Sequence, residues 1–339
     1  MQKLRLGILS AANIARKSLI PAALAADGVD VVAIASTSDK GAKFLADTNL
    51  LTKDGRPIGE AVRLFDSYEA MLADEEIDAV YIGLPNHLHM EWSIKAADAG
   101  KHVLCEKPAA LNAQETEAII RHCNMRNVVW MEAFMYRFHP QYEVVRDWLQ
   151  RDVIGKMKTI RSSFTFVMQD SANTRFVKDY GGGSLYDVGC YCVNVSQFLL
   201  GRAPRAVSGM MVETPEEIDE GFLGLMDYGD GQTALFHSSF GQEYSNYVEV
   251  FGTKGSIIVP AAFLPGNETA TLILRTEEGE QKILAPARNQ YQEQVQAFAS
   301  HVFAGTKPDV MSHEDTLDNM RTIDALFQSA REHRTVWLQ

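Results

Sequence analysis

At 339 residues the chain exceeds the usual size of one domain, about 100 to 200 residues, so two domains are expected. Its 46% hydrophobic and 22% charged residues are typical of a globular protein. The formal net charge of −12 disfavours nonspecific attraction to nucleic acid or to an anionic membrane surface, and we expect neither as a partner.

The cysteines and the first residues indicate the compartment. Four cysteines are too few for a disulfide framework, and the spacing of Cys190 and Cys192 fits neither a metal site nor a redox motif. The first residues lack a signal-peptide pattern, and no stretch of about 18 apolar residues follows. We therefore expect reduced cysteines and a cytoplasmic protein.

Residues 4 to about 130 alternate short apolar runs with helical patterns, which is the rhythm of parallel strands joined by crossover helices. The expected strands are Leu4–Leu9, Val29–Ala35, Ala79–Leu84, Val103–Leu104 and Val128–Met131. The expected helices are Ala12–Ala26, Tyr68–Ala73, His89–Ala99 and Ala113–His122. We predict an α/β fold in which residues 1–125 form a doubly wound parallel sheet, a Rossmann domain that binds a dinucleotide.

From about residue 156 the pattern becomes one of successive antiparallel strands separated by turn signals. The expected strands are Lys158–Val167, Ala206–Val212, Gly221–Tyr228, Thr233–Ser239, Tyr247–Phe251 and Thr271–Leu274, followed by helices near Gln290–Ala304 and Glu314–Glu332. We predict that residues 126–339 form an α+β domain on a mostly antiparallel, open-faced sheet. The open face is either a homodimer or homotetramer interface or a solvated polar surface.

The first expected strand leads into Ser10-Ala11-Ala12-Asn13-Ile14-Ala15, where a dinucleotide-binding turn carries G-x-G-x-x-G. Small residues occupy the three glycine positions and keep room for a close approach of the backbone. The helix that follows points its amide groups at a pyrophosphate. The alternative is a plain helix start. We predict cofactor contacts from Ser10, Ala12, Asn13 and Ile14.

The second expected strand ends near the place where an NAD-binding domain holds the ribose with an acidic residue. Ser36 and Thr37 offer hydrogen-bond donors there, and Lys40 supplies positive charge for a 2′-phosphate. These residues favour NADP over NAD. Asp39 leaves NAD open, because a shift of a few residues brings a carboxylate to the ribose, and an ordinary polar loop is the further alternative.

A third loop follows the strand at residues 79–84, at the strand end where such sheets bind ligands. We predict cofactor contacts from Leu84, Pro85, Asn86 and His89. A zinc site at His87 and His89 lacks further ligands at suitable spacing, so no metal is expected.

Glu106-Lys107-Pro108 follows the next apolar run, and Gly181-Gly182-Gly183 precedes Asp187-Val188-Gly189-Cys190-Tyr191. Together with the altered glycine turn and Pro85-Asn86-x-x-His89, these motifs resemble the Gfo/Idh/MocA family of nicotinamide-dependent oxidoreductases over nearly the whole chain. Residues 131–140 and Tyr191 resemble the branch that includes dimeric dihydrodiol dehydrogenase and NADP-linked xylose dehydrogenase. The resemblance implies a cofactor contact for Glu106 and both cofactor binding and catalysis for Lys107.

The chemistry supports a catalytic lysine independently of the resemblance. Hydride transfer to or from an alcohol carbon requires a proton to move at the oxygen. A lysine partly removed from water has its pKa lowered towards neutrality, because burial disfavours the charged form. Pro108 restricts the backbone at Lys107, which holds the amine in place. The alternative is a solvated lysine beside a proline turn.

Tyr191 is the second candidate for proton transfer, since the resemblance places a histidine or tyrosine there. Its hydroxyl can donate to the substrate oxygen, and the sequence leaves open whether Lys107 or Tyr191 is the formal acid or base. Asp187 lies four residues earlier, a spacing that aligns side chains on one helix face, and is expected to bind a sugar hydroxyl or to orient Tyr191. Packing and capping are the alternatives.

We predict substrate contacts from Arg137, His139, Asp187, Tyr191 and Asn194, with packing as the alternative for Arg137 and His139. The expected protein is an NADP-dependent oxidoreductase acting on a hydroxyl or ketone carbon of a sugar or cyclic diol. The alternative function is a regulatory protein of the same fold that senses dinucleotide and sugar without catalysis.

Overall fold

The computed structural model describes residues 3–37, 39–46, 49–170 and 173–338, and the chain divides into two compact units. Unit 1 contains Met1–Ala110, Gln114–Phe138 and Asn289–His313. Unit 2 contains Leu111–Ala113, His139–Arg288 and Glu314–Gln339. The segment Asn289–His313 therefore returns to unit 1 after most residues of unit 2 have passed in the sequence. The proposed domain boundary between residues 125 and 126 stays a prediction.

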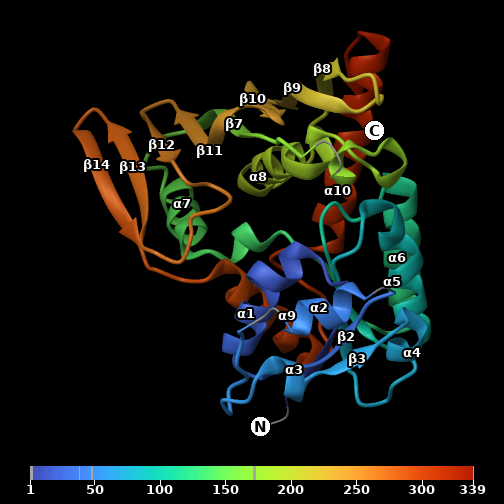
Figure 1. The fold of residues 1–339 in the computed structure, drawn as a ribbon. Coiled ribbons are helices and arrows are strands. Elements are labelled where there is room, and N and C mark those ends of the chain that lie inside the picture. Colours follow the sequence, from blue (N-terminus) through green and yellow to red (C-terminus); the bar gives the residue numbers. More distant parts are fainter. Residues whose placement is uncertain (1–2, 38, 47–48, 171–172, 339) are drawn as a thin grey trace. The chain divides into compact units, whose positions relative to one another are not determined.

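Unit 1 is built on a six-stranded sheet in which every pair of neighbours is parallel (Figure 1). Its strand order is β3-β2-β1-β4-β5-β6, so the chain moves outward in one direction from β1 and then in the other. The strands are β1 Leu4–Leu9, β2 Val29–Ala35, β3 Arg63–Phe65, β4 Ala79–Ile82, β5 His102–Cys105 and β6 Trp130–Glu132. This confirms the predicted doubly wound parallel sheet.

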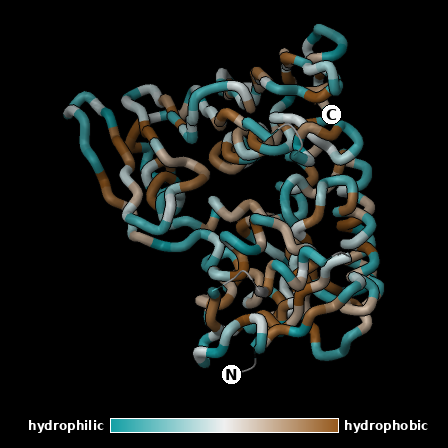
Figure 2. Tube along the Cα trace, in the orientation of Figure 1, coloured by the Kyte–Doolittle hydropathy of each residue, from teal (hydrophilic) through white to brown (hydrophobic). Residues whose placement is uncertain are grey.

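All four residues of β4 are completely buried, which shows that both faces of this sheet are covered. Helix α1 packs against β2, and α5 packs against β4 and β5. Figure 2 shows the hydrophobic segments of this unit gathered in its interior. The helices are η1 Ala15–Leu19, α1 Ile20–Ala25, α2 Lys40–Ala46, α3 Ile58–Ala61, α4 Tyr68–Leu72, η2 Asn86–Leu88, α5 His89–Asp98, α6 Ala113–Met125, η3 Met135–Phe138 and α9 Gln290–Ala304.

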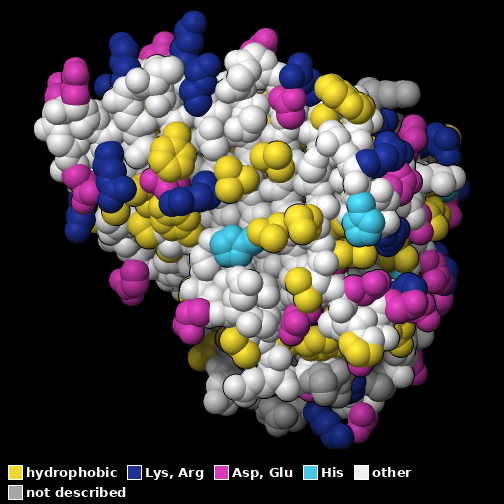
Figure 3. Space-filling model, turned by 90° about the horizontal axis from the view of Figure 1, so that it is seen from above, with side chains coloured by type: hydrophobic (Ala, Val, Ile, Leu, Met, Phe, Trp, Pro, Cys, Tyr) yellow, Lys and Arg dark blue, Asp and Glu magenta, His cyan; other side chains and the backbone are white. Residues whose placement is uncertain are grey.

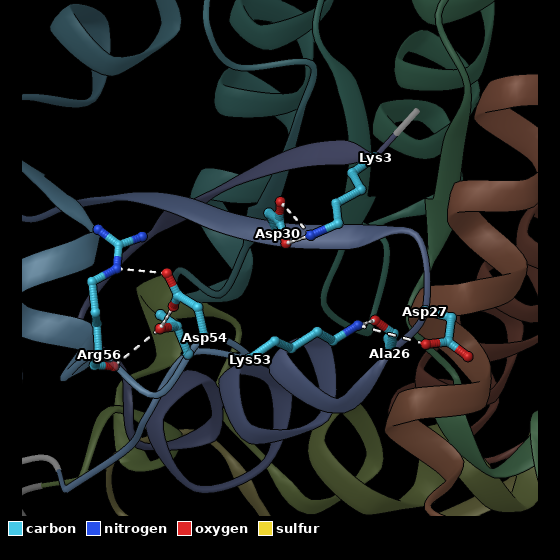
Figure 4. A network of polar contacts seen from close by, with 8 residues as sticks. Lys3, Ala26, Asp27, Asp30, Lys53, Asp54 and Arg56 are labelled. Carbon is cyan, nitrogen blue, oxygen red and sulfur yellow. Dashed lines mark hydrogen bonds and ion pairs between the residues drawn. The ribbon is translucent and has the colours of Figure 1, made fainter. Parts of the chain in front are cut away.

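Exposed ion pairs surround the region where β1 and β2 begin (Figure 4). The Lys3 ammonium lies 2.9 Å from a carboxylate oxygen of Asp30, the second residue of β2. In the nearby segment Arg56 pairs with Asp54 at 2.7 Å. Solvent screens such pairs, and each contributes only about 0 to 1 kcal/mol to stability.

Unit 2 contains a nine-stranded sheet with the order β14-β13-β12-β11-β7-β10-β9-β8-β15. Every pair of neighbours is antiparallel except β7 and β10, which run parallel. The turn between β13 and β14 is hydrophilic (Figure 2). The strands are β7 Met157–Val167, β8 Ala206–Glu213, β9 Asp219–Gly229, β10 Gln232–Ser239, β11 Gly241–Gly252, β12 Gly255–Val259, β13 Ala270–Thr276, β14 Gly279–Ala285 and β15 Val336–Trp337.

The two faces of this sheet differ. Helix α8 and the preceding turn η6 pack on β7 and β10, where Ala234 and Phe236 are buried. Leu235 between them points to the opposite face and is exposed. The helices of this unit are α7 Pro140–Gln150, η4 Thr174–Phe176, η5 Lys178–Tyr180, η6 Leu185–Gly189, α8 Cys190–Leu200 and α10 His313–Glu332. The predicted α+β domain on a mostly antiparallel sheet is thereby confirmed.

The exposed face of the unit 2 sheet carries a continuous apolar patch. Met210 pairs with Leu223 across β8 and β9, and Leu225 pairs with Leu235 across β9 and β10. Directly opposite residues of antiparallel strands share one face, so these side chains adjoin. Figure 3, which looks down on this side, shows apolar side chains gathered between charged ones. We define the sheet patch as Met210, Val212, Leu223, Leu225 and Leu235, all exposed.

Within the described part of the chain, no helix combines the length and the apolar character needed to span a membrane.

Candidate active site

The predicted cofactor residues of unit 1 follow neighbouring strands and lie at one edge of its sheet. The Ser10 amide, after β1, donates to the Ala35 carbonyl at the end of β2 over 3.1 Å. The Glu106 amide, after β5, donates to the Ile82 carbonyl at the end of β4 over 2.9 Å. Between them, β1 and β4 are the neighbours at which the strand order reverses. Open α/β sheets bind their ligands at this switch point.

Ser10, at the predicted first glycine position, takes a backbone conformation that favours glycine. Its φ is +113°, in a region that favours glycine and is strained for other residues. The chain becomes helical at Asn13, and the Arg16 amide donates to the Ala12 carbonyl over 3.1 Å. Ala15, at the third glycine position, is completely buried. The residues present therefore fit a pyrophosphate-binding turn in spite of the missing glycines.

The loop after β2 offers polar groups around Ser36, whose amide donates to the Phe65 carbonyl over 3.0 Å. Thr37 and Lys40 are exposed, and the Thr37 side chain hydrogen-bonds to Tyr68. The Asp39 carboxylate pairs with Lys43 at 2.5 Å. The Lys43 ammonium offsets the negative charge of this carboxylate. The repulsion between Asp39 and a 2′-phosphate at this loop is therefore reduced.

Glu106 is held by a tyrosine from the neighbouring strand. The buried Tyr81 hydroxyl of β4 donates to Glu106 Oε1 over 2.7 Å, and the Lys107 amide donates to Glu106 Oε2 over 3.3 Å. Burial, and next the charge of Glu106, raise the pKa of Tyr81 well above its ordinary value. Tyr81 therefore stays protonated and keeps donating, which fixes the carboxylate beside Lys107.

The segment after Lys107 is anchored as well. The Lys107–Pro108 peptide is cis, and the Ala109 amide donates to Glu132 Oε1 of β6 over 2.8 Å. Lys107 itself is half-buried, between the buried residues Cys105 and Pro108. The lysine thus projects from a segment fixed on both sides by carboxylates.

His89 opens helix α5 and is completely buried. Its Nδ1 lies 2.8 Å from the Pro108 carbonyl oxygen, and its Nε2 lies 2.9 Å from the Leu84 carbonyl oxygen. Both ring nitrogens are therefore occupied by the backbone, and a direct cofactor contact of His89 stays a prediction. Pro85 and Asn86, in the same loop, are half-buried. Among the described residues, no group of three His, Cys, Asp or Glu side chains is placed to hold a metal ion.

In unit 2, Tyr191 lies near the start of α8 within an aromatic cluster. Its ring centroid is 5.5 Å from that of Phe164 in β7 and 5.4 Å from that of Phe263. Phe263 lies in the segment after β12, where its amide donates to Asn246 Oδ1 over 2.6 Å. These contacts restrict the orientation of the Tyr191 ring.

Asp187 lies in η6, a π-helical turn directly before α8. Arg175 Nε donates to Asp187 Oδ2 over 2.7 Å, so the aspartate has a cation as its partner. A π turn holds one residue more than an α turn, and the same-face alignment of Asp187 with Tyr191 does not follow from their spacing alone.

A buried carboxylate anchors the turn that carries Asp187. Asp219 Oδ2 accepts from the Leu185 amide over 2.7 Å and from the Ser184 hydroxyl over 2.8 Å. Burial raises the Asp219 pKa to about 6. Gly183 has a φ of +115°, and a Cβ there would lie 2.1 Å from Asp219 Oδ1. The last residue of the glycine run is therefore needed for a close approach within the chain itself.

The remaining predicted substrate residues are buried. Arg137 Nη1 donates to the Val310 carbonyl over 2.7 Å within unit 1. His139 caps α7, with its Nδ1 accepting from the Gln141 amide, and burial lowers its pKa to about 4. Asn194 is completely buried in α8. Arg137 and His139 thus contact other parts of the protein, and substrate contacts of all three stay predictions.

Sequence reasoning missed four residues that position these groups: Tyr81, Arg175, Asp219 and Phe263. None of them is marked by a local motif, and the partner lies 12 residues away for Arg175, 25 for Tyr81 and 34 for Asp219. Only Tyr81 had a usable signal, since a hydroxyl inside an otherwise apolar parallel strand requires a buried partner.

Comparisons with known proteins agree with this architecture. Residues 4–134 match the model of an oxidoreductase family described as an NAD-binding Rossmann fold, and residues 142–258 match a model described as the GFO/IDH/MocA C-terminal domain. The chain is 37% identical to D-xylose 1-dehydrogenase (NADP(+)) 2 of Haloferax volcanii over 98% of this chain and 99% of that protein.

Two further similarities span much of the chain. Trans-1,2-dihydrobenzene-1,2-diol dehydrogenase of Xenopus tropicalis is 33% identical over 75% of this chain and 74% of that protein. The crystal structure of a 3-ketoreductase from Actinomadura kijaniata in complex with NADP and TDP-benzene superposes with a TM-score of 0.89 at 29% identity, covering 97% of this chain and 98% of that chain.

Proposed function

Because the chain belongs to the Gfo/Idh/MocA family of NAD(P)-dependent oxidoreductases, we propose that it uses NADP to interconvert a hydroxyl and a ketone or lactone carbon of a sugar or cyclic diol. The observation that carries the proposal is the common sheet edge of unit 1. There Ser10 takes a glycine-like conformation after β1, and Lys107 follows β5 on a segment anchored by Glu106 and Glu132.

The turn after β1 and the loop after β2 are proposed to hold the cofactor. When bound, the nicotinamide ring supplies or accepts the hydride. Ser10, Ala12, Asn13 and Ile14 bind the pyrophosphate through the turn and the helix start. Ser36, Thr37 and Lys40 bind the 2′-phosphate, with Lys40 as the cation. The loop of Leu84, Pro85 and Asn86 supports the nicotinamide half.

Lys107 and Tyr191 are proposed to handle the proton at the substrate oxygen. In oxidation the oxygen loses a proton as the hydride leaves its carbon, and in reduction it gains one as the hydride arrives. The fixed backbone on both sides of Lys107 and the aromatic cluster around Tyr191 support these roles by limiting how far each side chain moves. Either residue can be the formal acid or base.

A sugar or cyclic diol is the substrate class that the relatives favour, since they include a xylose dehydrogenase and a dihydrodiol dehydrogenase. A polyol needs several hydrogen-bonding partners in its pocket. Asp187 is proposed to bind a substrate hydroxyl, with Arg175 fixing the position of its carboxylate through a hydrogen bond. Asn194, Arg137 and His139 are the further proposed contacts.

The cofactor assignment is tested by titrating NADPH and NADH against the fluorescence of the four tryptophans. NADPH is expected to bind about tenfold more tightly or better, because a phosphate adds charge-assisted hydrogen bonds. Lys40→Ala should remove this preference. Lys53→Ala, at a lysine that pairs with Asp27, is the control and should retain it. Quenching by neither cofactor would overturn the proposed function.

The substrate class is tested by absorbance at the nicotinamide band with a panel of aldoses, cyclic polyols and ketosugars and both cofactors. Turnover of at least one sugar or cyclic diol, with a rate that depends on NADP, is the expected result. Cofactor binding without turnover of any panel member would favour a binding protein of the same fold and contradict the enzyme.

The sheet patch is proposed as the interface of a homodimer or homotetramer. Its five apolar side chains adjoin across three strands, and contiguous exposed apolar surface on a sheet is typical of an association site. Beyond the patch, Arg161 and Glu249 pair at 2.5 Å on neighbouring strands, and Glu249 is nearly buried. An ion pair next to apolar surface matches the arrangement of an interface, in which a polar rim surrounds an apolar core.

A cytoplasmic location is part of the same proposal. It is supported by the four cysteines, which are all buried free thiols, and by a function that requires NADP.

A further inference from the structure

His89 contacts two loops of the proposed cofactor edge at once. Its side chain rises from the first residue of α5 and reaches the Leu84 carbonyl with Nε2 and the Pro108 carbonyl with Nδ1, at 2.9 and 2.8 Å. Leu84 belongs to the loop after β4, and Pro108 directly follows Lys107 in the loop after β5. A single buried ring therefore spans the segment that supports the cofactor and the segment that carries the amine.

The chemistry of the two contacts is asymmetric. Both partners are carbonyl oxygens, which only accept, whereas a neutral imidazole has one N–H and one bare nitrogen. Burial lowers the His89 pKa to about 4, although the contacts with the Pro108 and Leu84 carbonyls act to raise it. The ring is therefore neutral at pH 7 and has a single N–H, which donates to one of the two carbonyls. Its tautomer selects which loop receives the hydrogen bond.

We infer that His89 is a positioning residue that fixes the Lys107 segment relative to the cofactor loop after β4. This inference rests on the proposed function, because it assigns Lys107 the proton transfer. A misplacement of about 1 Å at a reacting group costs on the order of a hundredfold in rate, so a ring that links the two loops has a direct kinetic effect.

Helix α5 has other anchors, so a substitution at His89 need not unfold it. Ser93 of α5 accepts a hydrogen bond from Trp130 Nε1 over 3.1 Å, and Trp92 and Ala96 are buried. The helix as a whole packs on β4 and β5. Replacement of the imidazole by a ring of similar size therefore removes the two polar contacts with little change in packing.

The kinetic test compares His89→Phe, which keeps a ring but has no donor, with His89→Gln, which keeps one amide donor. For His89→Phe we expect a kcat lowered about 10- to 100-fold, a changed pH profile of kcat and an NADPH affinity within about threefold of wild type. His89→Gln should recover part of kcat. A wild-type kcat and pH profile in His89→Phe would overturn the inference.

His313→Phe is the matched control. His313 also opens a helix and lies 3.0 Å through Nε2 from a backbone carbonyl, that of Trp130, which belongs to β6 and to neither loop. Its substitution should leave kcat and the pH profile unchanged. An equal loss of kcat in His313→Phe would show that the effect is one of general stability and would contradict positioning by His89.

A readout that does not depend on turnover separates this inference from the proposed function. Nitrogen NMR of histidine-labelled wild-type protein should show a neutral His89 ring at pH 7 with one N–H protected from exchange with solvent. A freely exchanging or freely titrating ring would overturn the inference even in an active enzyme. Conversely, full turnover by a Lys107 variant would overturn the proposed proton transfer while the protected ring remained.

Discussion

The two sheets of the molecule differ in how much of their surface is left for function. Helices bury both faces of the unit 1 sheet, as the completely buried β4 shows, so only its edges are free to bind. The unit 2 sheet carries helices on one face and exposes an apolar patch on the other. A doubly covered sheet thus directs chemistry to its strand ends, whereas a singly covered sheet offers a face for association.

The strongest test of the edge as a chemical site is Lys107→Ala. Loss of the proton-transferring amine should lower kcat by about 10²- to 10⁴-fold, with NADPH binding retained. Steady-state kinetics and fluorescence titration measure the two effects. Lys95→Ala is the control, because this half-exposed lysine pairs with Glu91 and Glu69 and its loss should leave kcat unchanged. A kcat within threefold of wild type in Lys107→Ala would disprove the role.

Tyr191→Phe tests whether unit 2 supplies a proton-transfer group in addition to packing. Removal of the hydroxyl should lower kcat about a hundredfold, because the proton-transferring group is lost. The ring and its contacts with Phe164 and Phe263 remain, so the packing is kept. The matched control is Tyr228→Phe, a buried tyrosine of the same unit whose hydroxyl lies 3.8 Å from Met226 Sδ. Equal kcat values for the two variants would exclude a chemical role of Tyr191.

Asp219→Asn tests the buried carboxylate of unit 2 through pH. The folded-state pKa of about 6 lies above the ordinary 3.8, so the folded protein holds the proton more tightly. The stability of the wild type therefore falls as pH rises from about 4 to 6, by about 3 kcal/mol from this group. The variant should lack this loss and gain stability relative to wild type above pH 6.

Denaturant unfolding between pH 4 and pH 8 measures the difference in the free energy of unfolding. Asp227→Asn is the control of opposite sign, because hydrogen bonds with Gly229 and Arg205 lower the pKa of Asp227. It should show no relative gain above pH 6. Parallel stability curves for wild type and Asp219→Asn would refute the raised pKa.

Leu223→Glu tests the exposed face of unit 2. A charge in the middle of the sheet patch should raise the dissociation constant of the oligomer about tenfold or more, because the carboxylate would lose its water on association. Light scattering over a dilution series measures the change. Leu51→Glu is the matched control, since both leucines are 57% exposed and Leu51 lies in unit 1. If Leu223→Glu assembles as the wild type does, the sheet patch is not part of the interface.

Prediction from the sequence succeeded where a local pattern determines the structure. The apolar run of β4 and the chemistry of Glu106-Lys107-Pro108 are local, and they identified the parallel sheet and its edge. The strands β3 and β14 escaped prediction because their residues are mostly exposed and lack apolar alternation. The pairing of β7 with β10 is parallel, in contrast to the expected run of antiparallel neighbours, because pairing across the sheet is not encoded in either strand alone.

The supporting residues of the candidate site could not be predicted for the same reason. Asp219 and Leu185 are 34 residues apart, and Tyr81 and Glu106 are 25 apart. Helix α9 joins unit 1 after the chain has built most of unit 2. Such contacts depend on the assembled fold. The turn at Ser10, in contrast, could be proposed from the sequence, because small residues after the first strand are a local requirement.

The most direct test of the central claim is a crystal structure of the enzyme with NADP and a sugar or diol that it turns over. The proposal predicts the Lys107 amine about 2.6 to 3.2 Å from the oxygen on the reacting carbon, or one bridging water away. A lysine that points into bulk solvent, with another group of the protein at that oxygen, would contradict it.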